Sequence, residues 1–403
     1  MPGPARELLA DRHFRGFWLA QTAFASINGT LRFTFVWLVV TLTDWSTAEG
    51  IVAGLLGLPA MLFSLLAGAW SDRIDRKRMF MVWTMASLVA LGGFTFVIAS
   101  GVANPLLAGL AAFVIGVTVS VSPPNINAMV PLLVSPDRLM SAVALQNGAM
   151  QAAGFVSVIV AGVAIEVFGD AGGFGILTVL AALALLAMRS VTIPPDPVST
   201  AAEETFARSV LTGVRYAWRT EPVRTLVSLS MVLGSSFSVM QIAMPRVVEE
   251  DFGLEAGSAA TVMAMFGAGM FLSSVVMVSR PVGRHGWNIA VLIGVGLGGG
   301  QFALSLATGF TMAMVIMFLW GVNAGVAMTS HRTVLQASTA PEMMGRVMGL
   351  MMTGFMGGLP IGALTASLLS VVVSPASTMT IVGGATVVIA SALSWRPAIV
   401  RLT

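Results

Sequence analysis

The 403-residue chain contains no cysteine, and only 10% of its residues are charged. Without cysteine there are no disulfides, no thiolate nucleophiles and no cysteine-ligated metal sites. The three histidines, His13, His285 and His331, are scattered along the chain and lack the spacing of a metal site. A P-loop is also absent, which excludes nucleotide hydrolysis by that route. We therefore expect no enzymatic activity, no cofactor and no bound metal.

Hydrophobic residues, in contrast, make up 56% of the chain. A soluble domain carries about 25% charged residues, far more than this chain. Apolar runs of about 20 residues recur along the sequence, and runs of that length are typical of transmembrane helices. We predict an all-α membrane protein with twelve transmembrane helices. The predicted spans are Phe17–Thr43, Ile51–Trp70, Met79–Ser100, Leu106–Met129, Leu139–Ile165, Gly172–Met188, Val223–Met244, Ala256–Val278, Trp287–Ala307, Thr311–Thr329, Met343–Leu369 and Ser377–Ser394.

The basic residues support this count, because arginine and lysine are enriched in cytoplasmic loops. With the N-terminus inside, all of them except Arg32 and Arg246 fall into alternate loops on the cytoplasmic side. The outer loops contain mainly carboxylates, namely Asp44, Glu49, Asp170, Glu249, Glu250, Asp251 and Glu255. Twelve soluble core helices would not separate the charges in this way. We expect a multi-pass protein of the bacterial cytoplasmic (inner) membrane with both termini cytoplasmic.

A polar stretch after Met188 divides the chain into two groups of six spans. We predict a first six-helix bundle over residues 1–188, a cytoplasmic linker over 189–222 and a second bundle over 223–403. The segment "SPDRLMSAVAL" follows the fourth span and "APEMMGRVMGL" follows the tenth, which indicates an internal repeat. Parallel six-span repeats are typical of transporters with a substrate site at the membrane midplane, so we expect two pseudo-symmetric bundles.

The linker contains a predicted amphipathic helix. Its apolar residues recur at intervals of four, at Phe206, Val210, Val214 and Trp218. Arg208, Arg215 and Arg219 fall on other faces of the helix. This pattern is compatible with a helix that lies on the cytoplasmic leaflet. A linker helix packed on the second bundle would have the same pattern.

The stretch "GAWSDRIDRKR", residues 68–78, resembles the motif between spans two and three of the major facilitator superfamily: Gly, three residues, Asp-Arg, then a basic cluster. A degraded second copy, "SRPVGRHGW", lies between spans eight and nine. "SPDRLMSAVALQNG" and "APEMMGRVMGLMMTGFMGGLPIGAL" look like the subgroup of transmembrane secretion effectors and enterobactin-type exporters. The resemblance implies secondary active transport of an amphipathic or anionic small molecule by alternating access, with export as the expected direction. An importer of the same fold and a transport-inactive receptor or sensor are the alternatives.

The same resemblance implies a conformational latch at the motif. Gly68 would allow close approach of helices, and Asp72 would face the start of span eleven near Arg346, across the interface of the two halves. Arg73 and Arg76 would contact acidic groups and lipid headgroups. For the basic residues that follow Arg73, the simpler interpretation is that they only enforce the membrane topology.

The sequence departs from the family pattern at several positions. Asp75 stands where the motif usually has Gly, and Thr30 stands where span one often has a carboxylate. Ser157–Val158 replaces the Gly-Pro of the antiporter pattern in span five. These differences weaken a simple proton-antiport mechanism. The proton remains a candidate coupling ion, with Glu166 near the end of span five as the candidate proton site.

Arg32 is the only ionisable residue well inside a predicted span, and intramembrane charges are usually functional. Asn28 lies one turn before it on the same face. Because a guanidinium does not deprotonate, Arg32 suits anion binding or a breakable salt bridge. A snorkelling arginine that reaches the outer interface is the alternative.

Further polar side chains within the spans could line a cavity with Arg32; they are Asn147, Gln151, Gln241 and Asn323. Taken singly, each is better explained by an interhelical hydrogen bond, whereas the set as a whole favours a cavity. The expected partners are a small-molecule substrate and the lipid bilayer. Nucleic acid is not expected, because the basic cluster lacks interleaved aromatic residues. We expect the chain to act as a monomer.

Overall fold

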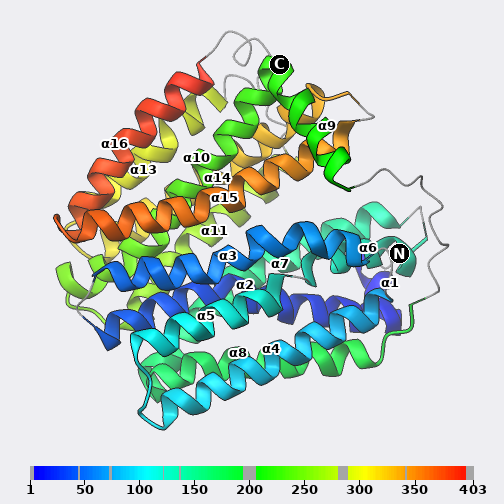
Figure 1. The fold of residues 1–403 in the computed structure, drawn as a ribbon, viewed down its shortest axis with the longest axis horizontal. Helices are drawn as coiled ribbons and strands as arrows, with labels where there is room; N and C mark the ends of the chain where they lie inside the picture. Colours follow the sequence, from blue (N-terminus) through cyan, green and yellow to red (C-terminus); the bar gives the residue numbers. More distant parts are fainter. Residues whose placement is uncertain are drawn as a thin grey trace. The chain divides into compact units, whose positions relative to one another are not determined.

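The computed structural model describes residues 4–43, 46–71, 75–120, 122–135, 138–193, 206–279, 289–340 and 343–395, and all regular elements in these ranges are helices (Figure 1). They are α1 (Pro4–Ala10), α2 (Arg12–Leu42), α3 (Ser46–Ser71), α4 (Arg76–Ala99), α5 (Pro105–Ser120), α6 (Ser122–Leu133), α7 (Leu139–Phe168), α8 (Asp170–Arg189), α9 (Phe206–Arg219), α10 (Glu221–Arg246), the π-helix η1 (Val247–Asp251), α11 (Ala256–Ser279), the π-helix η2 (Ile289–Ile293), α13 (Gly296–Ser305), α14 (Phe310–Ala337), α15 (Met344–Ser370) and α16 (Pro375–Ser394).

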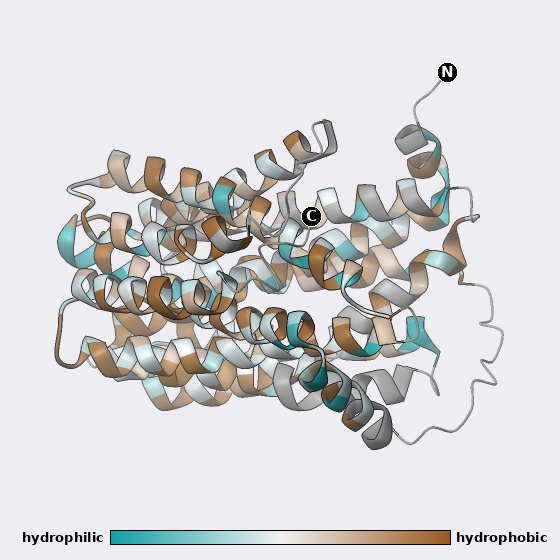
Figure 2. Ribbon diagram, turned by 90° about the horizontal axis from the view of Figure 1, so that it is seen from above, coloured by the Kyte–Doolittle hydropathy of each residue, from teal (hydrophilic) through white to brown (hydrophobic). Residues whose placement is uncertain are grey.

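Within the described ranges, nine helices are long and apolar enough to cross a membrane. Three shorter apolar helices, Thr47–Pro59, Pro105–Ser120 and Val291–Ser305, overlap the predicted spans two, four and nine in part. Together these segments account for the twelve predicted spans. Hydrophobic residues run along the long helices (Figure 2), and many of them are exposed, as expected for helices that face lipid.

The chain divides into two compact units. Unit 1 comprises Met1–Thr43 and Leu55–Ala202, and unit 2 comprises Asp44–Gly54 and Glu203–Thr403. One boundary falls in the predicted linker, and the other falls inside α3. The first turns of α3 therefore belong to unit 2, whereas the rest of this helix belongs to unit 1.

Unit 1 is built mainly from packing of α2 on α7 and α8, and of α4 on α8. Its core contains a cluster of three phenylalanines from these helices. The centroid of the Phe174 ring lies 4.9 Å from that of Phe35 and 5.0 Å from that of Phe94, and both pairs are edge to face. Such pairs contribute beyond the area they bury. At Gly169, a positive φ of 68° ends α7 and allows the chain to turn into α8.

Unit 2 is built mainly from packing of α10 on α15, of α11 on α14 and of α13 on α16. Small residues bring α10 and α15 together. A side chain at Gly358 would collide with the backbone of Met231, and one at Gly362 with the backbone of Ser235. The hydroxyl of Ser235 also donates to the carbonyl of Gly358 at 3.0 Å. Backbones that approach this closely are typical of helix pairs in membranes, where packing replaces the hydrophobic effect.

Candidate functional site

A buried polar contact joins α2 and α7 in unit 1. The hydroxyl of Thr30 donates to the hydroxyl of Ser157 at 2.7 Å, and Ser157 in turn donates to the carbonyl of Ser26 at 3.2 Å. Directly beside it, a Cβ added at Gly29 would lie 2.9 Å from the Cα of Gly154. The two helices therefore approach closely here. This seam brings together two positions where the sequence departs from the antiporter pattern, Thr30 and Ser157.

The two predicted cavity residues of span one both lie on α2. Asn28 is exposed and its amide donates to the carbonyl of Phe24 at 3.2 Å, a contact within its own helix. Arg32 lies one turn further along and is half-buried. The structure thus places both side chains on one helix face, as the spacing predicts. Their role in binding stays a prediction.

The remaining cavity candidates lie on three helices. Asn147 and Gln151 belong to α7, and their side chains are outside the described part of the structure. Gln241 of α10 is half-buried, and its Oε1 has no hydrogen-bond partner among the described residues. Asn323 of α14 donates to the carbonyl of Leu292 at 3.1 Å, which ties α14 to η2. Gln241 therefore has an unused acceptor, whereas the amide of Asn323 already makes a contact between helices.

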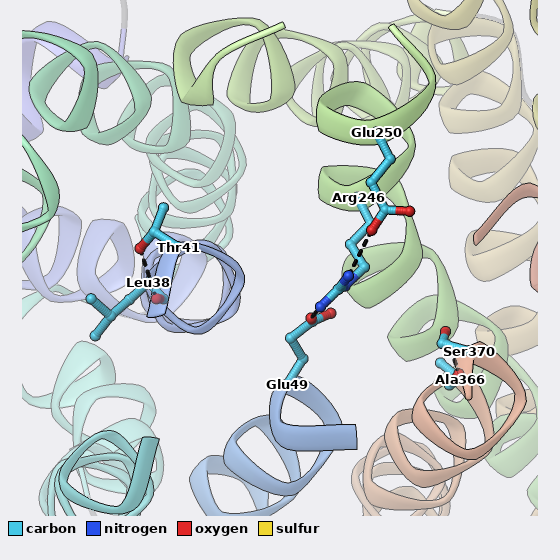
Figure 3. A network of polar contacts seen from close by, with 7 residues as sticks. All are labelled: Leu38, Thr41, Glu49, Arg246, Glu250, Ala366 and Ser370. Atoms are coloured by element: carbon cyan, nitrogen blue, oxygen red, sulfur yellow. Dashed lines mark hydrogen bonds and ion pairs between the residues drawn. The ribbon is translucent and has the colours of Figure 1, made fainter. Parts of the chain in front are cut away.

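Unit 2 contains an ion-pair network that the sequence analysis did not predict (Figure 3). Arg246, near the end of α10, contacts the carboxylate of Glu49 with Nε and Nη2. Its Nη1 contacts Glu250 at 2.6 Å. The side chain of Glu49 is only 1% exposed, whereas that of Glu250 is 42% exposed. A single guanidinium therefore pairs with two carboxylates, one buried and one at the surface. We name these three residues the Glu49–Arg246 network.

The residue after Glu49 fixes how closely α3 approaches α15. A Cβ added at Gly50 would collide with the side chain of Ser367 and would lie 2.6 Å from the carbonyl oxygen of Ala363. Only glycine fits at this contact. The first turns of α3 are thus held to unit 2 by a buried ion pair with α10 and by a close contact with α15. The signal in the sequence was Arg246 itself, because it is the only arginine of the predicted outer loops and stands among carboxylates.

The predicted latch motif is described in part. Asp72 and Arg73 lie outside the described residues, and Gly68 lies in the last turns of α3. Asp75 is the N-cap of α4: its side chain accepts the backbone N–H of Arg78 at 2.7 Å. This gives a structural reason for an aspartate at a position where the family usually has Gly, because an N-cap carboxylate satisfies a free helix N–H. Arg76 is the first residue of α4.

The basic residue after Arg76 also makes a structural contact. The ammonium of Lys77 donates to the carbonyl of Val191 at 2.5 Å and to that of Arg189 at 3.4 Å. These carbonyls lie at and just after the end of α8, where a cation is favourable. In addition to any effect on topology, Lys77 therefore connects the start of α4 with the end of α8.

The last two candidates lie far apart in the chain. Glu166 is exposed near the end of α7. Arg346 is half-buried near the start of α15, and a Cβ added at Gly213 of α9 would lie 3.0 Å from its Cβ. The proton-site role of Glu166 and the latch role of Arg346 stay predictions.

The nine long apolar helices and the three shorter ones define an α-helical protein that crosses the membrane several times. The family model of the Major Facilitator Superfamily matches residues 17–363. The chain belongs to this superfamily of membrane transporters, which confirms the predicted fold class and the family resemblance.

The chain is 23% identical over 360 residues to the multidrug efflux pump Tap of Mycobacterium tuberculosis (strain ATCC 25618 / H37Rv), with 85% of this chain and 83% of Tap covered. Among solved structures, it is similar to the nucleoside transporter NupG, with a TM-score of 0.72, 18% identity, and 95% of this chain and 98% of NupG covered. It is also similar to a bacterial homologue of the human lysosomal transporter Spinster, with a TM-score of 0.71, 15% identity, and 94% and 95% covered. The two structures support the fold.

Proposed function

We propose that the protein is a secondary active exporter of a small amphipathic or anionic molecule. The observation that carries the proposal is the division of α3 between the two units. In alternating access, one bundle moves relative to the other. Because α3 has residues in both units, we propose that its contacts form and break during this movement. The family assignment supports transport, and the similarity to the efflux pump Tap supports export.

Arg32 is the proposed substrate-binding residue for an anionic group. It is half-buried in α2, and a guanidinium keeps its charge at all physiological pH values. Asn28, one turn away, and Gln241, whose Oε1 is unused among the described residues, are proposed to contribute polar contacts. Asn147, Gln151 and Asn323 complete the proposed set.

The proposed mechanism uses two sets of breakable contacts. The Glu49–Arg246 network holds the first turns of α3 within unit 2. Asp72, with Gly68, Arg73, Arg76 and Arg346, forms the second latch that the family motif implies. A buried ion pair suits this role, because a buried charge that loses its partner is strongly destabilising.

The proton is the proposed coupling ion, with Glu166 as the proposed proton site. Thr30 and Ser157 are not proposed as proton carriers, because their hydroxyls are buried, pair with each other and do not titrate in the physiological range. We further propose that the protein acts as a monomer in the bacterial cytoplasmic membrane, with both termini cytoplasmic.

The test uses purified full-length protein in proteoliposomes and two fluorescent probes, anionic fluorescein and cationic ethidium. We expect an imposed proton gradient to drive the accumulation of fluorescein. The probe should collect on the side of the membrane opposite the two chain termini. Arg32→Ala should abolish it and Arg32→Lys should retain part of it. The orientation of the protein in the liposomes is determined from the accessibility of the linker to added protease.

Three results would contradict the proposal. Accumulation toward the side of the cytoplasmic ends would indicate an importer. Binding of a probe without any accumulation would indicate a receptor. Unchanged fluorescein transport by Arg32→Ala would remove Arg32 from the substrate site. Ethidium transport that survives the substitution, with loss of fluorescein transport, would show that Arg32 selects the charge of the substrate.

A further inference from the structure

The linker helix α9 has one face packed on unit 2. Gly213 and Ala217 are four residues apart, so they share a face, and both are buried. Gly213 lies against Arg346 of α15. The hydroxyl of Tyr216 accepts the backbone N–H of Ala340 at 3.0 Å. Through this face, α9 contacts both the connection that follows α14 and the start of α15, so it is part of the folded unit.

The opposite face of α9 is exposed and combines large apolar with basic side chains. Leu211 and Trp218 are seven residues apart and share a face, and their side chains are 67% and 58% exposed. Arg215 and Arg219 lie beside them on the same side of the helix and are also exposed. The helix, Phe206–Arg219, contains no acidic residue. We name Leu211, Arg215, Trp218 and Arg219 the outer face of α9.

Most of the exposed large apolar residues elsewhere in the described ranges lie on helices that are long and apolar enough to span the membrane, where lipid tails would cover them. The outer face of α9 differs, because basic side chains stand next to its apolar ones and the helix is too short to span. An exposed leucine and tryptophan beside two arginines match the boundary between acyl chains and headgroups. The positive charge, with no carboxylate on the helix to compensate it, matches an anionic headgroup.

We propose that the outer face of α9 binds anionic lipid headgroups at the surface of the bilayer. Trp218 and Leu211 enter the interfacial region, and Arg215 and Arg219 bind the phosphates. Because the inner face holds Ala340 and Arg346, lipid binding fixes the position of the start of α15. The proposal rests on the membrane location of the family and on the two faces of α9. It does not depend on the substrate, the direction of transport or the coupling ion.

The absence of cysteine makes a direct test possible, because a single introduced cysteine is labelled uniquely. A nitroxide label is attached to Leu211→Cys in the full-length protein, which is then reconstituted in bilayers of phosphatidylcholine with increasing phosphatidylglycerol. Immersion is measured as the ratio of label collisions with oxygen, which concentrates in lipid, to collisions with a water-soluble nickel chelate. We expect immersion to rise with the anionic lipid fraction.

Arg215→Gln/Arg219→Gln in the same labelled protein should weaken this response, by about fivefold in apparent lipid affinity for each arginine. Arg12→Gln/Arg189→Gln is the matched control, since it removes the same charge from two exposed arginines outside α9 and should leave the response unchanged. Thermal unfolding of each variant verifies that the fold is retained.

Two results would overturn the proposal. The label could stay accessible to the nickel chelate at every lipid composition, which would indicate that the outer face of α9 serves another protein or stays in water. Alternatively, the two double variants could respond to phosphatidylglycerol equally, which would show that any lipid effect arises from the net charge of the chain and not from α9.

Discussion

Thr30 of α2 donates a 2.7 Å hydrogen bond to Ser157 of α7, and both side chains are buried. These are two of the positions at which the sequence departs from the pattern of the family that it resembles. Here the two substituted positions bond to each other. Two neutral hydroxyls therefore pair across the contact of α2 and α7, and each has a hydrogen-bond partner.

We expect Thr30→Val to destabilise unit 1 by about 1 kcal/mol, because one buried interhelical hydrogen bond is lost while Ser157 keeps its contact with Ser26. The pH dependence of transport should not change. Ser157→Ala should cost a similar amount. In the double variant Thr30→Val/Ser157→Ala the loss should be less than the sum, because the same bond is removed twice. Additive losses, measured by thermal unfolding in detergent, would show that the two hydroxyls act independently.

Glu49→Gln is expected to destabilise the protein by about 3 kcal/mol, because it removes the buried partner of Arg246 and leaves a guanidinium with only the exposed Glu250. The matched control is Glu250→Gln, which removes the exposed partner of the same arginine and should cost about 0–1 kcal/mol. Chemical unfolding of both variants gives the comparison. Equal losses would show that burial does not distinguish the two carboxylates.

A substitution at Gly50 tests the close contact of α3 with α15. Gly50→Ala should destabilise the protein, because the added methyl group collides with Ser367 and approaches the carbonyl of Ala363. Gly54 lies one turn further along α3, and a Cβ there meets no atom of the described residues within 4 Å. Gly54→Ala should therefore stabilise the helix by up to about 1 kcal/mol. Opposite signs in thermal unfolding are expected, and a gain in stability for both variants would contradict the contact.

Asp75 and Asp72, three residues apart in one motif, are expected to respond differently to neutralisation. Asp75→Asn should retain stability and transport, because asparagine is an equally good N-cap, whereas Asp75→Ala should cost about 1 kcal/mol. For Asp72, the latch hypothesis predicts that Asp72→Asn already impairs transport. The proteoliposome assay and thermal unfolding separate these roles. Impaired transport in Asp75→Asn would show that the negative charge of Asp75, and not its capping bond, is required.

The positions of the spans could be predicted from the sequence because twenty apolar residues in a row have one stable arrangement in a bilayer. The alternating arginines further constrained their number. The family motif then indicated the fold. Each of these signals is local or is repeated many times along the chain, so an error of a few residues at one helix end does not alter the result.

Contacts between distant segments could not be predicted in the same way. The sequence shows Glu49 and Arg246 as separate loop charges, 197 positions apart, and only the folded chain brings them together. The contact of Asn323 with the carbonyl of Leu292 is a second example, because the sequence shows a polar residue within a span but not the segment to which its amide donates. Asp75 had no explanation from the family pattern, although its distance of three residues from Arg78 is the ordinary spacing of an N-cap bond.

The division of α3 also has a consequence for attempts to produce the two halves as separate polypeptides. A fragment that begins at Glu203 would contain Arg246 and Ser367 but not Glu49 and Gly50 of the first turns of α3, which contact them. Arg246 would lose its buried carboxylate partner and keep only Glu250, and the fragment with the first half would contain Glu49 without its arginine. A chain break in the linker would therefore separate the two parts of unit 2. To restore these contacts, the second half would have to be combined with a peptide that contains the first turns of α3.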